Sequence, residues 1–592
     1  MRSLSRRSAS LLVSSLLLVA ACDSESEQPG SGAAASGAGT ATGGAAAGGA
    51  TTGGNGTGGA AGGSGGGQVG GTGGTAGSAG VDPCIDGPLV GLPYPHRAPM
   101  DMKGIQPDFW PNKQELVDHH TGTVAMNLVW AHWEPQVKTP PCSGAEQEYS
   151  GRCYVISSAV DDAIADWTSR GVEVTAVLYG VPPWARTGNP NCSPIAQGFE
   201  IFCTPDDANE YGRFVGMVAS RYDGLKGHGR VADFVIHNEV NANAWFDIGC
   251  GQGTPCDTHT WIQTYADSYN VAYDEIKQHQ SEARVLFSFE HHFDTVFDQP
   301  SDTNAMLSVK TFITQLDGLV GNRRWQVAYH PYAPSLLSAE FSPLDLPRVT
   351  YGNLGVLLGW LRTTFPNDAC AWTVQLTESG INSGAPSSEA AQGPAVCDSL
   401  RNVLATPGIT NYLYHRMQDV ASEAPLVLGL HRENGSAKPA WEVWAWANHT
   451  GPGHPSLSCG FEHLPYTRLA SSHGGWAGLH WASSRLAPSG FVEDAAWYLL
   501  RAEEPGTELL FECFVPDAGA GVNAFSSTDP LCAGATSMGP VGYLWTSQVT
   551  DTVPLYHCTR TVAVWTDTFV SADANCEGNG NGTLLGYVRP IP

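Results

Sequence analysis

The stretch FVIHNEVNANAWF, residues 234–246, indicates how the chain folds. It opens with three apolar strand formers and then stops abruptly at Asn238 and Glu239. In a parallel barrel the strands are buried, and their C-terminal ends open onto the face where active sites are built. A hydrophobic run that ends on an amide and a carboxylate is typical of such a strand. Other runs of this chain end in the same way.

Strand-like runs alternate with helical patterns from residue 83 to residue 450, which predicts strand–helix units around a parallel sheet. Eight strands in this length predict a (β/α)8 TIM barrel with insertions. Most runs end in polar or aromatic residues, as in HNEVN, EHH, HPY, TESG and YHR. The runs predicted as strands are 88–92, 123–130, 172–180, 232–239, 284–292, 325–332, 373–379 and 408–416.

Two glutamates, Glu239 and Glu378, end the predicted fourth and seventh strands. A closed barrel would bring both carboxylates to one mouth. Glycoside hydrolysis needs such a pair, one to protonate the leaving oxygen and one to attack the anomeric carbon or activate water. The alternative is a pair of structural carboxylates in a barrel that binds sugar without cleaving it.

Asn-Glu at the end of strand four and a second Glu at the end of strand seven resemble the retaining glycoside hydrolases of clan A. More closely, NLVW, VLYGVPPWA, VIHNEVNANAWF, YHPYAPSL, QLTESGINS, YHRMQD and LVLGLHRENGSAKPAWEVW resemble a bacterial barrel family of unknown function related to that clan. The resemblance implies that Glu239 is the acid/base, that Glu378 is the nucleophile and that Asn238 binds the sugar hydroxyl beside the reacting carbon. Val240 departs from the proline that often follows the acid/base, and Asn127 stands where the clan often has an arginine.

Further strand-end residues are candidates for contact with sugar. His330 and Tyr332 could position the nucleophile, and tryptophans suit stacking on a sugar face, although each could equally be a satisfied strand-end or core residue. For His291 and His292 we expect no direct role. The predicted substrate-binding residues are Asn238, His330, Tyr332, Asn127, Trp245, Trp184 and His415.

No metal or organic cofactor is expected, because the sequence has neither an HExxH helix nor a GxxxxGK[ST] loop. The formal net charge of −27 comes from 30 basic and 57 acidic residues. Such a field repels nucleic acid and anionic membrane surfaces and favours neutral or cationic partners. The resemblance to glycoside hydrolases implies a carbohydrate partner, and we expect a monomer. A membrane contact is expected only through a lipid anchor.

The N-terminus predicts export. Residues 1–22 have a basic start, a short apolar stretch and small residues before Cys22, which is typical of a signal peptide. The tetrapeptide VAAC resembles a lipobox, which implies lipidation of Cys22; a plain secretory signal is the alternative. Residues 23–82 are nearly all Gly, Ala, Ser and Thr and predict a flexible linker. The predicted product is a membrane-anchored lipoprotein, in the periplasm or at the cell surface.

Without Cys22, 14 of the 15 cysteines remain, an even number that suits disulfides in an exported protein. A zinc site ranks behind, since no close CxxC pair with histidines is present. The spacing suggests local pairs, which leaves two distant cysteines to join each other. The predicted pairs are Cys142–Cys153, Cys192–Cys203, Cys250–Cys256, Cys370–Cys397, Cys513–Cys532, Cys558–Cys576 and Cys84–Cys459.

Residues 451–592 contain a threefold repeat, marked by Tyr498, Tyr543 and Tyr587 at intervals of 45 and 44 residues. Three such copies predict a smaller all-β module, either β-trefoil-like or a short chain of β units, because one copy cannot bury its apolar face alone. The last two copies resemble short repeats appended to other exported bacterial proteins. The module could bind carbohydrate or act as a structural cap.

Together these patterns predict an exported retaining glycoside hydrolase that acts on an extracellular polysaccharide or oligosaccharide. The alternative is a non-catalytic, surface carbohydrate-binding protein on a barrel scaffold. The two differ in whether the parent protein cleaves the glycan that it binds.

Overall fold

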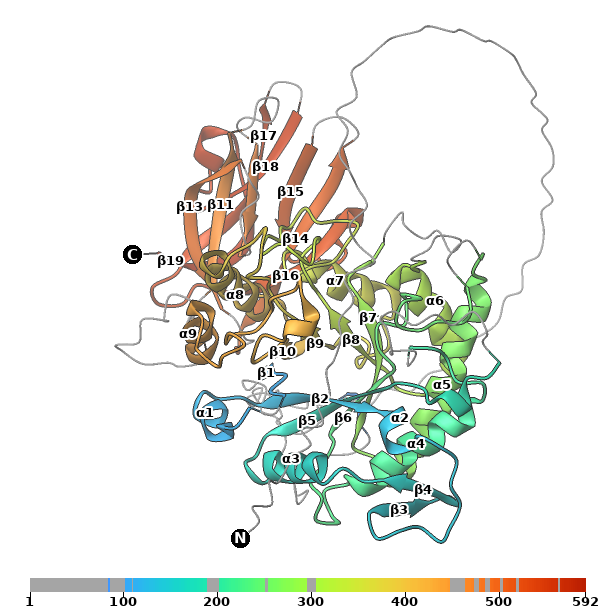
Figure 1. Cartoon of the computed structure of the whole chain (residues 1–592). Coiled ribbons are helices and arrows are strands. Elements are labelled where there is room, and N and C mark those ends of the chain that lie inside the picture. Colours follow the sequence, from blue (N-terminus) through green and yellow to red (C-terminus); the bar gives the residue numbers. More distant parts are fainter. Residues whose placement is uncertain are drawn as a thin grey trace, which may run out of the picture. The chain divides into compact units, whose positions relative to one another are not determined.

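The structure is a computed structural model, and residues 1–592 are drawn in Figure 1. Cys22, the 23–82 linker and the predicted strand 88–92 lie outside the residues that it describes. The described residues are 83–85, 102–108, 110–188, 202–250, 254–294, 305–447, 464–472, 479–484, 490–500, 504–517, 521–562 and 565–591.

Eight parallel strands form a closed barrel in chain order, and the last strand pairs with the first (Figure 1). The predicted (β/α)8 barrel is confirmed, and seven of its strands overlap the predicted runs. The first is instead a three-residue strand, too short to show a pattern in the sequence. The strands are β1 Lys103–Ile105, β2 Thr123–Val129, β5 Glu173–Tyr179, β6 Asp233–Ile236, β7 Arg284–Glu290, β8 Gln326–His330, β9 Val374–Ser379 and β10 Ile409–Tyr414.

Helices follow the strands and cover the barrel. Several begin at a side chain that accepts a hydrogen bond from the first turn, such as Asp257 and Ser308. None of the described helices combines the length and apolarity needed to span a membrane. The α-helices are α1 Lys113–Asp118, α2 Trp130–Trp133, α3 Ser158–Ser169, α4 Ala208–Arg221, α5 Thr258–His279, α6 Val309–Val320, α7 Leu354–Thr364, α8 Glu389–Leu404 and α9 Pro439–Trp446.

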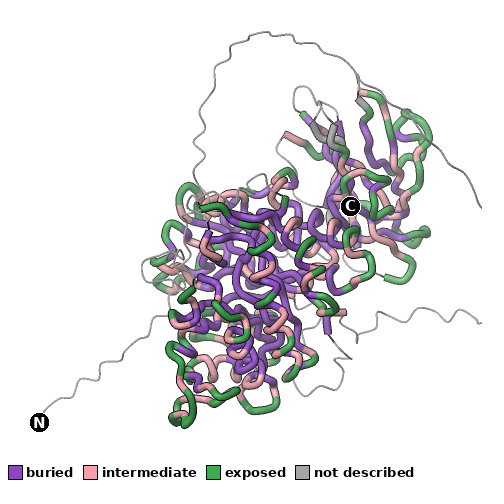
Figure 2. Tube along the Cα trace, turned by 90° about the vertical axis from the view of Figure 1, so that its right-hand side faces the viewer, coloured by how far each residue is buried: buried purple, intermediate pink, exposed green. Residues whose placement is uncertain are grey.

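The barrel interior is filled by side chains. Val177, Val235 and Leu286 form an aliphatic cluster inside it, and their strands pair in register. Elsewhere in the barrel, polar side chains bond to one another: the Gln375 amide donates to Gln326 Oε1, and the Asn411 amide donates to Gln375 Oε1. Buried residues therefore run through the centre of the barrel, as Figure 2 shows. The site must lie where this filling stops, at the C-terminal ends of the strands.

Three short segments extend the loops at the barrel's C-terminal face. A two-stranded hairpin, β3 Glu146–Tyr149 and β4 Arg152–Val155, follows α2. The 3-10 helix η1, Pro183–Ala185, follows β5, and η2, Ala421–Glu423, follows β10.

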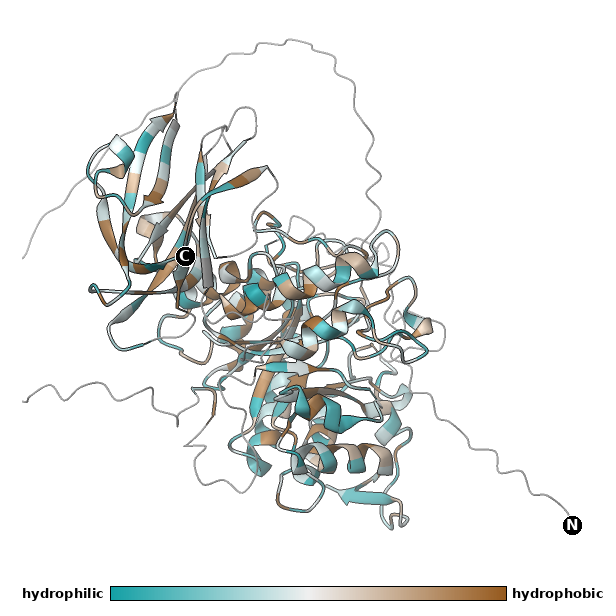
Figure 3. Cartoon of the chain, turned by 90° about the vertical axis from the view of Figure 1, so that its left-hand side faces the viewer, coloured by the Kyte–Doolittle hydropathy of each residue, from teal (hydrophilic) through white to brown (hydrophobic). Residues whose placement is uncertain are grey.

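The C-terminal region forms nine antiparallel strands, and the predicted threefold all-β module is confirmed. In each copy the first strand pairs with both the second and the third, and β19 also pairs with β13 and β16. Figure 3 shows hydrophobic residues in these strands as in the barrel. The strands are β11 Leu464–Ser471, β12 His480–Ser483, β13 Phe491–Leu499, β14 Thr507–Asp517, β15 Gly521–Ser527, β16 Thr536–Trp545, β17 Val553–Val562, β18 Trp565–Ser571 and β19 Thr583–Pro590.

Five disulfides join described cysteines. Four match the predicted pairs, Cys142–Cys153, Cys250–Cys256, Cys513–Cys532 and Cys558–Cys576. The fifth is Cys84–Cys370, so the predicted pairs Cys84–Cys459 and Cys370–Cys397 are wrong. Folding brings Cys84 to Cys370 across 286 residues, which sequence proximity cannot anticipate. Cys203 and Cys397 are also disulfide-bonded, but Cys192 and Cys459 lie outside the described residues.

The distant disulfide should stabilise the fold far more than a local one. Replacing Cys84 and Cys370 by Ser frees a loop of 286 residues, whereas the matched change at Cys250 and Cys256 frees a loop of 6. Loop-closure entropy predicts that the first variant loses about 3 kcal/mol more of unfolding free energy than the second. Chemical denaturation measures both, and equal losses would contradict the assignment.

Candidate active site

Glu239 sits on a strained turn just after β6. His237 and Glu239 have φ angles of 58° and 41°, in the left-handed region that side chains with a Cβ seldom adopt. The neighbouring strand β7 fixes this turn, because Ser288 Oγ accepts from the Glu239 N–H at 2.9 Å and Ser288 O from the Val240 N–H at 3.0 Å. Such strain persists only where the surroundings enforce it, and it concentrates at functional sites.

Glu239 shares a hydrogen bond with His330, the last residue of β8. The His330 Nδ1 atom lies 2.8 Å from Glu239 Oε1, and its Nε2 atom lies 3.1 Å from Thr377 Oγ1 on β9. Both side chains are buried, with His330 fully so. The imidazole thus bridges from the end of β6 to β9.

Glu378 lies on β9 beside this pair and is partly exposed. The Tyr332 hydroxyl donates to Glu378 Oε1 at 3.0 Å. One carboxylate oxygen of Glu239, one ring nitrogen of His330 and one carboxylate oxygen of Glu378 all lie within 4.8 Å of one another. The barrel therefore brings the two predicted carboxylates together.

The surroundings favour a proton on the Glu239–His330 pair. Burial raises the pKa of Glu239 above its usual range, the hydrogen bond from His330 opposes this, and the charges of Glu378 and Glu290 add to the rise. Burial alone would lower the pKa of His330, but its bond to Glu239 and the charge of Glu378 raise it. Because the two groups share a hydrogen bond, they titrate as a unit.

Tyr332 remains a donor to Glu378. Burial and then the charge of Glu378 raise the pKa of the Tyr332 hydroxyl well above its usual range. The hydroxyl is therefore protonated at any physiological pH. Of the predicted substrate-binding residues, Tyr332 and His330 are the two that contact the carboxylate pair directly.

The remaining predicted polar residues have different surroundings. Asn238 is buried, and its Oδ1 atom has no hydrogen-bond partner among the described residues. Asn127 is partly exposed on β2, opposite Val177. His415 is buried after β10, where its Nδ1 atom lies 2.9 Å from Gln106 Oε1. Asn238 therefore keeps an uncommitted acceptor beside Glu239.

The two predicted tryptophans differ in their packing. Trp245 is partly exposed and lies edge-on to Phe202 at 4.3 Å between ring centroids. Trp184 packs against Trp130 at 5.5 Å, and its indole N–H donates to the Glu134 carbonyl at 2.9 Å. These contacts bind Trp184 into the packing around α2, and none of them joins it to the two carboxylates.

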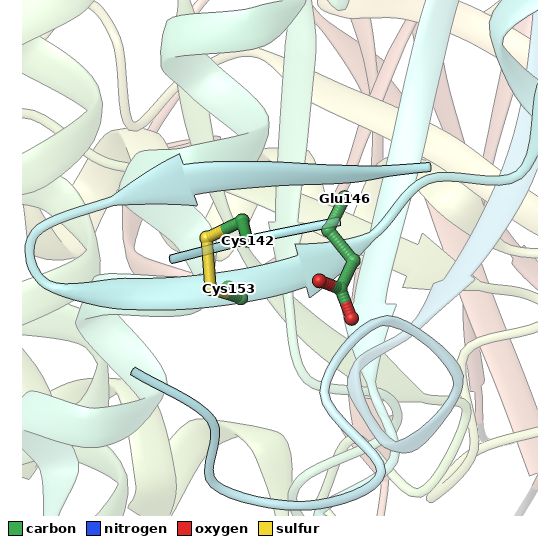
Figure 4. Close-up of side chains that lie close together, drawn as sticks. All are labelled: Cys142, Glu146 and Cys153. Carbon is green, nitrogen blue, oxygen red and sulfur yellow. A yellow bond between two sulfur atoms is a disulfide. The ribbon is translucent and has the colours of Figure 1, made fainter. Parts of the chain in front are cut away.

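Three groups of described side chains could in principle ligate a metal ion. They are Glu239, His330 and Glu378; Glu290, His291 and His292; and Cys142, Glu146 and Cys153. In the last, Figure 4 shows the two sulfur atoms bonded to each other, with the Glu146 carboxylate beside them. Both sulfur atoms are used in the disulfide, and Glu146 forms an ion pair with Lys138. This group therefore stabilises the β3–β4 hairpin and does not form a metal site.

Residues 95–451, more than half of the chain, match the model of the family of unknown function DUF5722. The chain belongs to the DUF5722 family. No curated protein matches it.

Among solved structures, the DUF5722 chain is similar to a family 39 glycoside hydrolase from the gut symbiont Bacteroides cellulosilyticus WH2, with 12% identity over 84% of this chain and 83% of that one and a TM-score of 0.40. It is similar to a glucosidase from Croceicoccus marinus at 10% identity, over 81% and 88% of the two chains, with a TM-score of 0.39. It is also similar to the β-glycosidase from Thermosphaera aggregans at 16% identity, over 60% and 88%, with a TM-score of 0.39.

Two aromatic residues of the DUF5722 barrel that were not predicted, Tyr179 and Phe202, form an aromatic wall with Trp245. Tyr179 ends β5 and stacks on Phe202 at 5.8 Å, and Phe202 meets Trp245. Burial raises the pKa of the Tyr179 hydroxyl, and the charge of Glu378 adds to this, so the hydroxyl lies in the field of that carboxylate. The signal for Tyr179 was its place at a strand end, whereas Phe202 lies in an insertion without a pattern.

A buried ion-pair group lies just after the last barrel strand. Arg416 follows β10 and pairs with Asp108 and Glu423. Its charge is thus neutralised within the DUF5722 barrel and is not offered to a substrate. Local sequence patterns could not predict this group, because Asp108 precedes Arg416 by 308 residues.

His237, in the turn before Glu239, should lower the unfolding free energy of the protein in acid. Burial lowers the pKa of His237, which stacks on Tyr211 at 4.1 Å, to about 3. Below pH 6.5, the ordinary pKa of histidine, His237 is protonated in the unfolded chain but stays neutral in the folded protein. The unfolding free energy therefore falls as pH falls from about 6.5 towards 3. The His237→Phe variant should lose about 2 kcal/mol less unfolding free energy than the parent between pH 7 and pH 5.

Urea denaturation at the two pH values measures this difference. Tyr211 and Phe246 flank the ring, so phenylalanine keeps the aromatic packing and removes only the titration. The same pH dependence in both proteins would show that His237 is not buried in its neutral form.

Proposed function

We propose that this protein is an exported retaining glycoside hydrolase with Glu239 as acid/base and Glu378 as nucleophile. The observation that carries the proposal is the pair of carboxylates within 4.8 Å at the barrel mouth, in unlike environments. Glu239 is buried with a raised pKa, whereas Glu378 is partly exposed and accepts from Tyr332. Pairs of carboxyls whose surroundings separate their protonation states divide acid and nucleophile roles.

The short separation favours retention over inversion. Retaining enzymes place their two carboxyls about 5 to 5.5 Å apart, whereas inverting enzymes leave about 6.5 to 9.5 Å for a water molecule. Oxygen atoms of Glu239 and Glu378 within 4.8 Å leave little room for that water. This geometry supports a direct attack by Glu378 on the sugar.

In the first step a Glu378 oxygen attacks the anomeric carbon while the bond to the leaving oxygen breaks. Tyr332 holds Oε1, so Oε2 is the attacking atom. The leaving oxygen takes the proton of Glu239, and the product is a glycosyl ester on Glu378.

In the second step the Glu239 carboxylate takes a proton from water, whose oxygen attacks the anomeric carbon and displaces Glu378. Glu239 thus acts as the acid in the first step and as the base in the second, as microscopic reversibility requires. Asn238 is placed beside Glu239 to bind the neighbouring sugar hydroxyl, a contact that tightens in the transition state.

The proposed substrate is an extracellular polysaccharide or oligosaccharide. The wall of Tyr179, Phe202 and Trp245 offers apolar rings of the kind on which sugar faces stack. Binding without turnover, by the same wall and Asn238, is the competing function. No metal or organic cofactor is required by either step.

Export and anchoring belong to the same proposal. Five disulfides among described residues indicate folding in an oxidising compartment. The N-terminal sequence supports a signal peptide, lipidation at Cys22 and a flexible linker over residues 23–82. A monomer held at the periplasmic membrane or the cell surface would present the barrel, residues 83–450, and the module, residues 451–592, to glycans.

Removing either carboxylate should nearly abolish hydrolysis. The Glu239→Gln and Glu378→Gln variants are each expected to lower kcat/KM about 10²- to 10⁴-fold on a glycan that the parent cleaves. A dinitrophenyl glycoside should restore bond cleavage in Glu239→Gln but not in Glu378→Gln, because that leaving group needs no proton. The release of dinitrophenolate in a single turnover measures the difference.

Glu134→Gln is the matched control, because Glu134 is also buried but pairs with Arg152 beside α2. Its kcat/KM should stay close to that of the parent. Full activity in both site variants would refute the assignment, and tight binding of a glycan panel with no cleavage by the parent would favour the binding protein.

The stereochemistry of the product gives a separate prediction. ¹H NMR recorded in the first minutes of hydrolysis should show the sugar released with the same anomeric configuration as the substrate. A double displacement through Glu378 requires this outcome. Release of the opposite anomer would mean that water attacks directly and that Glu378 is a base.

A further inference from the structure

Glu290 is a buried carboxylate that the proposed steps do not use. It ends β7, the strand between β6 and β8, and is 5% exposed. Its Oε1 atom accepts from the His292 N–H at 3.0 Å and from the Asn241 amide, and its Oε2 atom contacts His292 Nδ1. His291 Nδ1 lies 3.7 Å from Oε2. A carboxylate with this many donors is held in one position and one charge state.

Asn241 connects Glu290 to the turn that carries Glu239. Its Oδ1 atom accepts from the Glu290 N–H at 3.1 Å while its Nδ2 atom donates to the Glu290 carboxylate. The Asn241 carbonyl in turn accepts from the Leu307 N–H at 2.8 Å. Since Asn241 follows Glu239 by two residues, this bracket fixes the strained turn from its C-terminal side.

Glu290 also lies beside both members of the protonated pair. In the barrel register Glu290 is directly opposite His330 on β8. Two residues earlier on β7, Ser288 accepts from the Glu239 N–H. The charge of Glu290 raises the pKa of both Glu239 and His330.

Burial would raise the pKa of Glu290, but the charge and hydrogen bonds of His292 and the charge of His291 lower it to about 2. The carboxylate therefore stays ionised at any pH where the protein works. Among the described residues, the ionisable groups that interact with Glu290 or with the pair are Glu378, His291, His292, Tyr329, Tyr332 and, next to His291, Arg348.

We propose that Glu290 is a positioning residue: through Asn241 it holds the turn of Glu239, and its fixed negative charge helps to keep a proton on the Glu239–His330 pair. The term acid/base for Glu239 rests on the proposed function, whereas the effect of the charge on its proton is a property of the fold. Two like charges at close range cannot both form easily, so ionised Glu290 disfavours ionised Glu239.

The test is a ¹³C NMR titration of the full chain labelled at glutamate side-chain carboxyls. The Glu239 resonance is identified by its absence in Glu239→Gln. The neutral variants Glu290→Gln and Glu290→Ser should lower its titration midpoint by about one pH unit. Glu290→Asp keeps the charge and should leave the midpoint in place.

Glu423→Gln is the matched control, since Glu423 is a buried carboxylate of the same mouth that pairs with Arg416. It should not move the midpoint. On a glycan that the parent hydrolyses, the alkaline limb of kcat/KM should move down by the same amount in Glu290→Gln, with KM little changed.

An unchanged midpoint in the folded neutral variants would overturn the proposal. Unfolding of both neutral variants, seen by near-UV circular dichroism, would also count against it, because Glu290 would then be needed for folding rather than for the proton. If the parent cleaves no glycan, the proposed function fails, while the titration still decides the role of Glu290.

Discussion

The hydrogen bond between Glu239 and His330 is the interaction on which the site depends. A buried carboxylate is costly unless it is paired or neutral, and His330 provides the partner without adding a permanent cation. The pair holds a proton because burial disfavours ionised Glu239, and the negative charges of Glu378 and Glu290 add to this effect. A proton held at the mouth next to a partly exposed carboxylate is the arrangement that acid-assisted displacement requires.

The barrel makes this arrangement rigid by using three adjacent strands together. The strand β6 delivers Glu239, β7 anchors its turn through Ser288, and β8 ends on His330. The positive φ angle of Glu239 would be unfavourable in a free loop, so the anchors on β7 are what keep it populated. The hydrogen bonds of Glu239 to Ser288 and His330 thus stabilise both its strained backbone and its buried carboxylate.

The sequence was sufficient for the barrel and the carboxylate pair because both have local signals. Counting the predicted strands places the one that ends in Asn-Glu fourth and the one that ends in Glu-Ser seventh. Closure of the barrel then brings their C-terminal ends to the same face. The strand β1 was missed because three residues carry no periodicity, and the Cys84–Cys370 disulfide because its partners meet only after folding.

The network around the pair was hidden for a similar reason. Phe202 lies in an insertion without a pattern. Glu290 stands at a polar strand end, but its contact with Asn241 depends on the strand register and could not be read from the sequence. Trp184 shows the limit of such a signal: it follows a strand end, as a sugar platform would, and its ring packs on Trp130 while its indole N–H donates to the Glu134 carbonyl. Sequence position alone does not distinguish the two roles.

We expect Glu378 to form a covalent bond to sugar while Glu239 supplies the proton. Mass spectrometry of the protein after incubation with activated 2-deoxy-2-fluoro glycosides would detect this bond, because the fluorine slows the release of a glycosyl ester more than its formation. One added fluorosugar is expected on the peptide that contains Glu378, and none in Glu378→Gln. A fluorosugar on another residue, or hydrolysis of the parent's glycan with no trapped ester from any reagent, would contradict it.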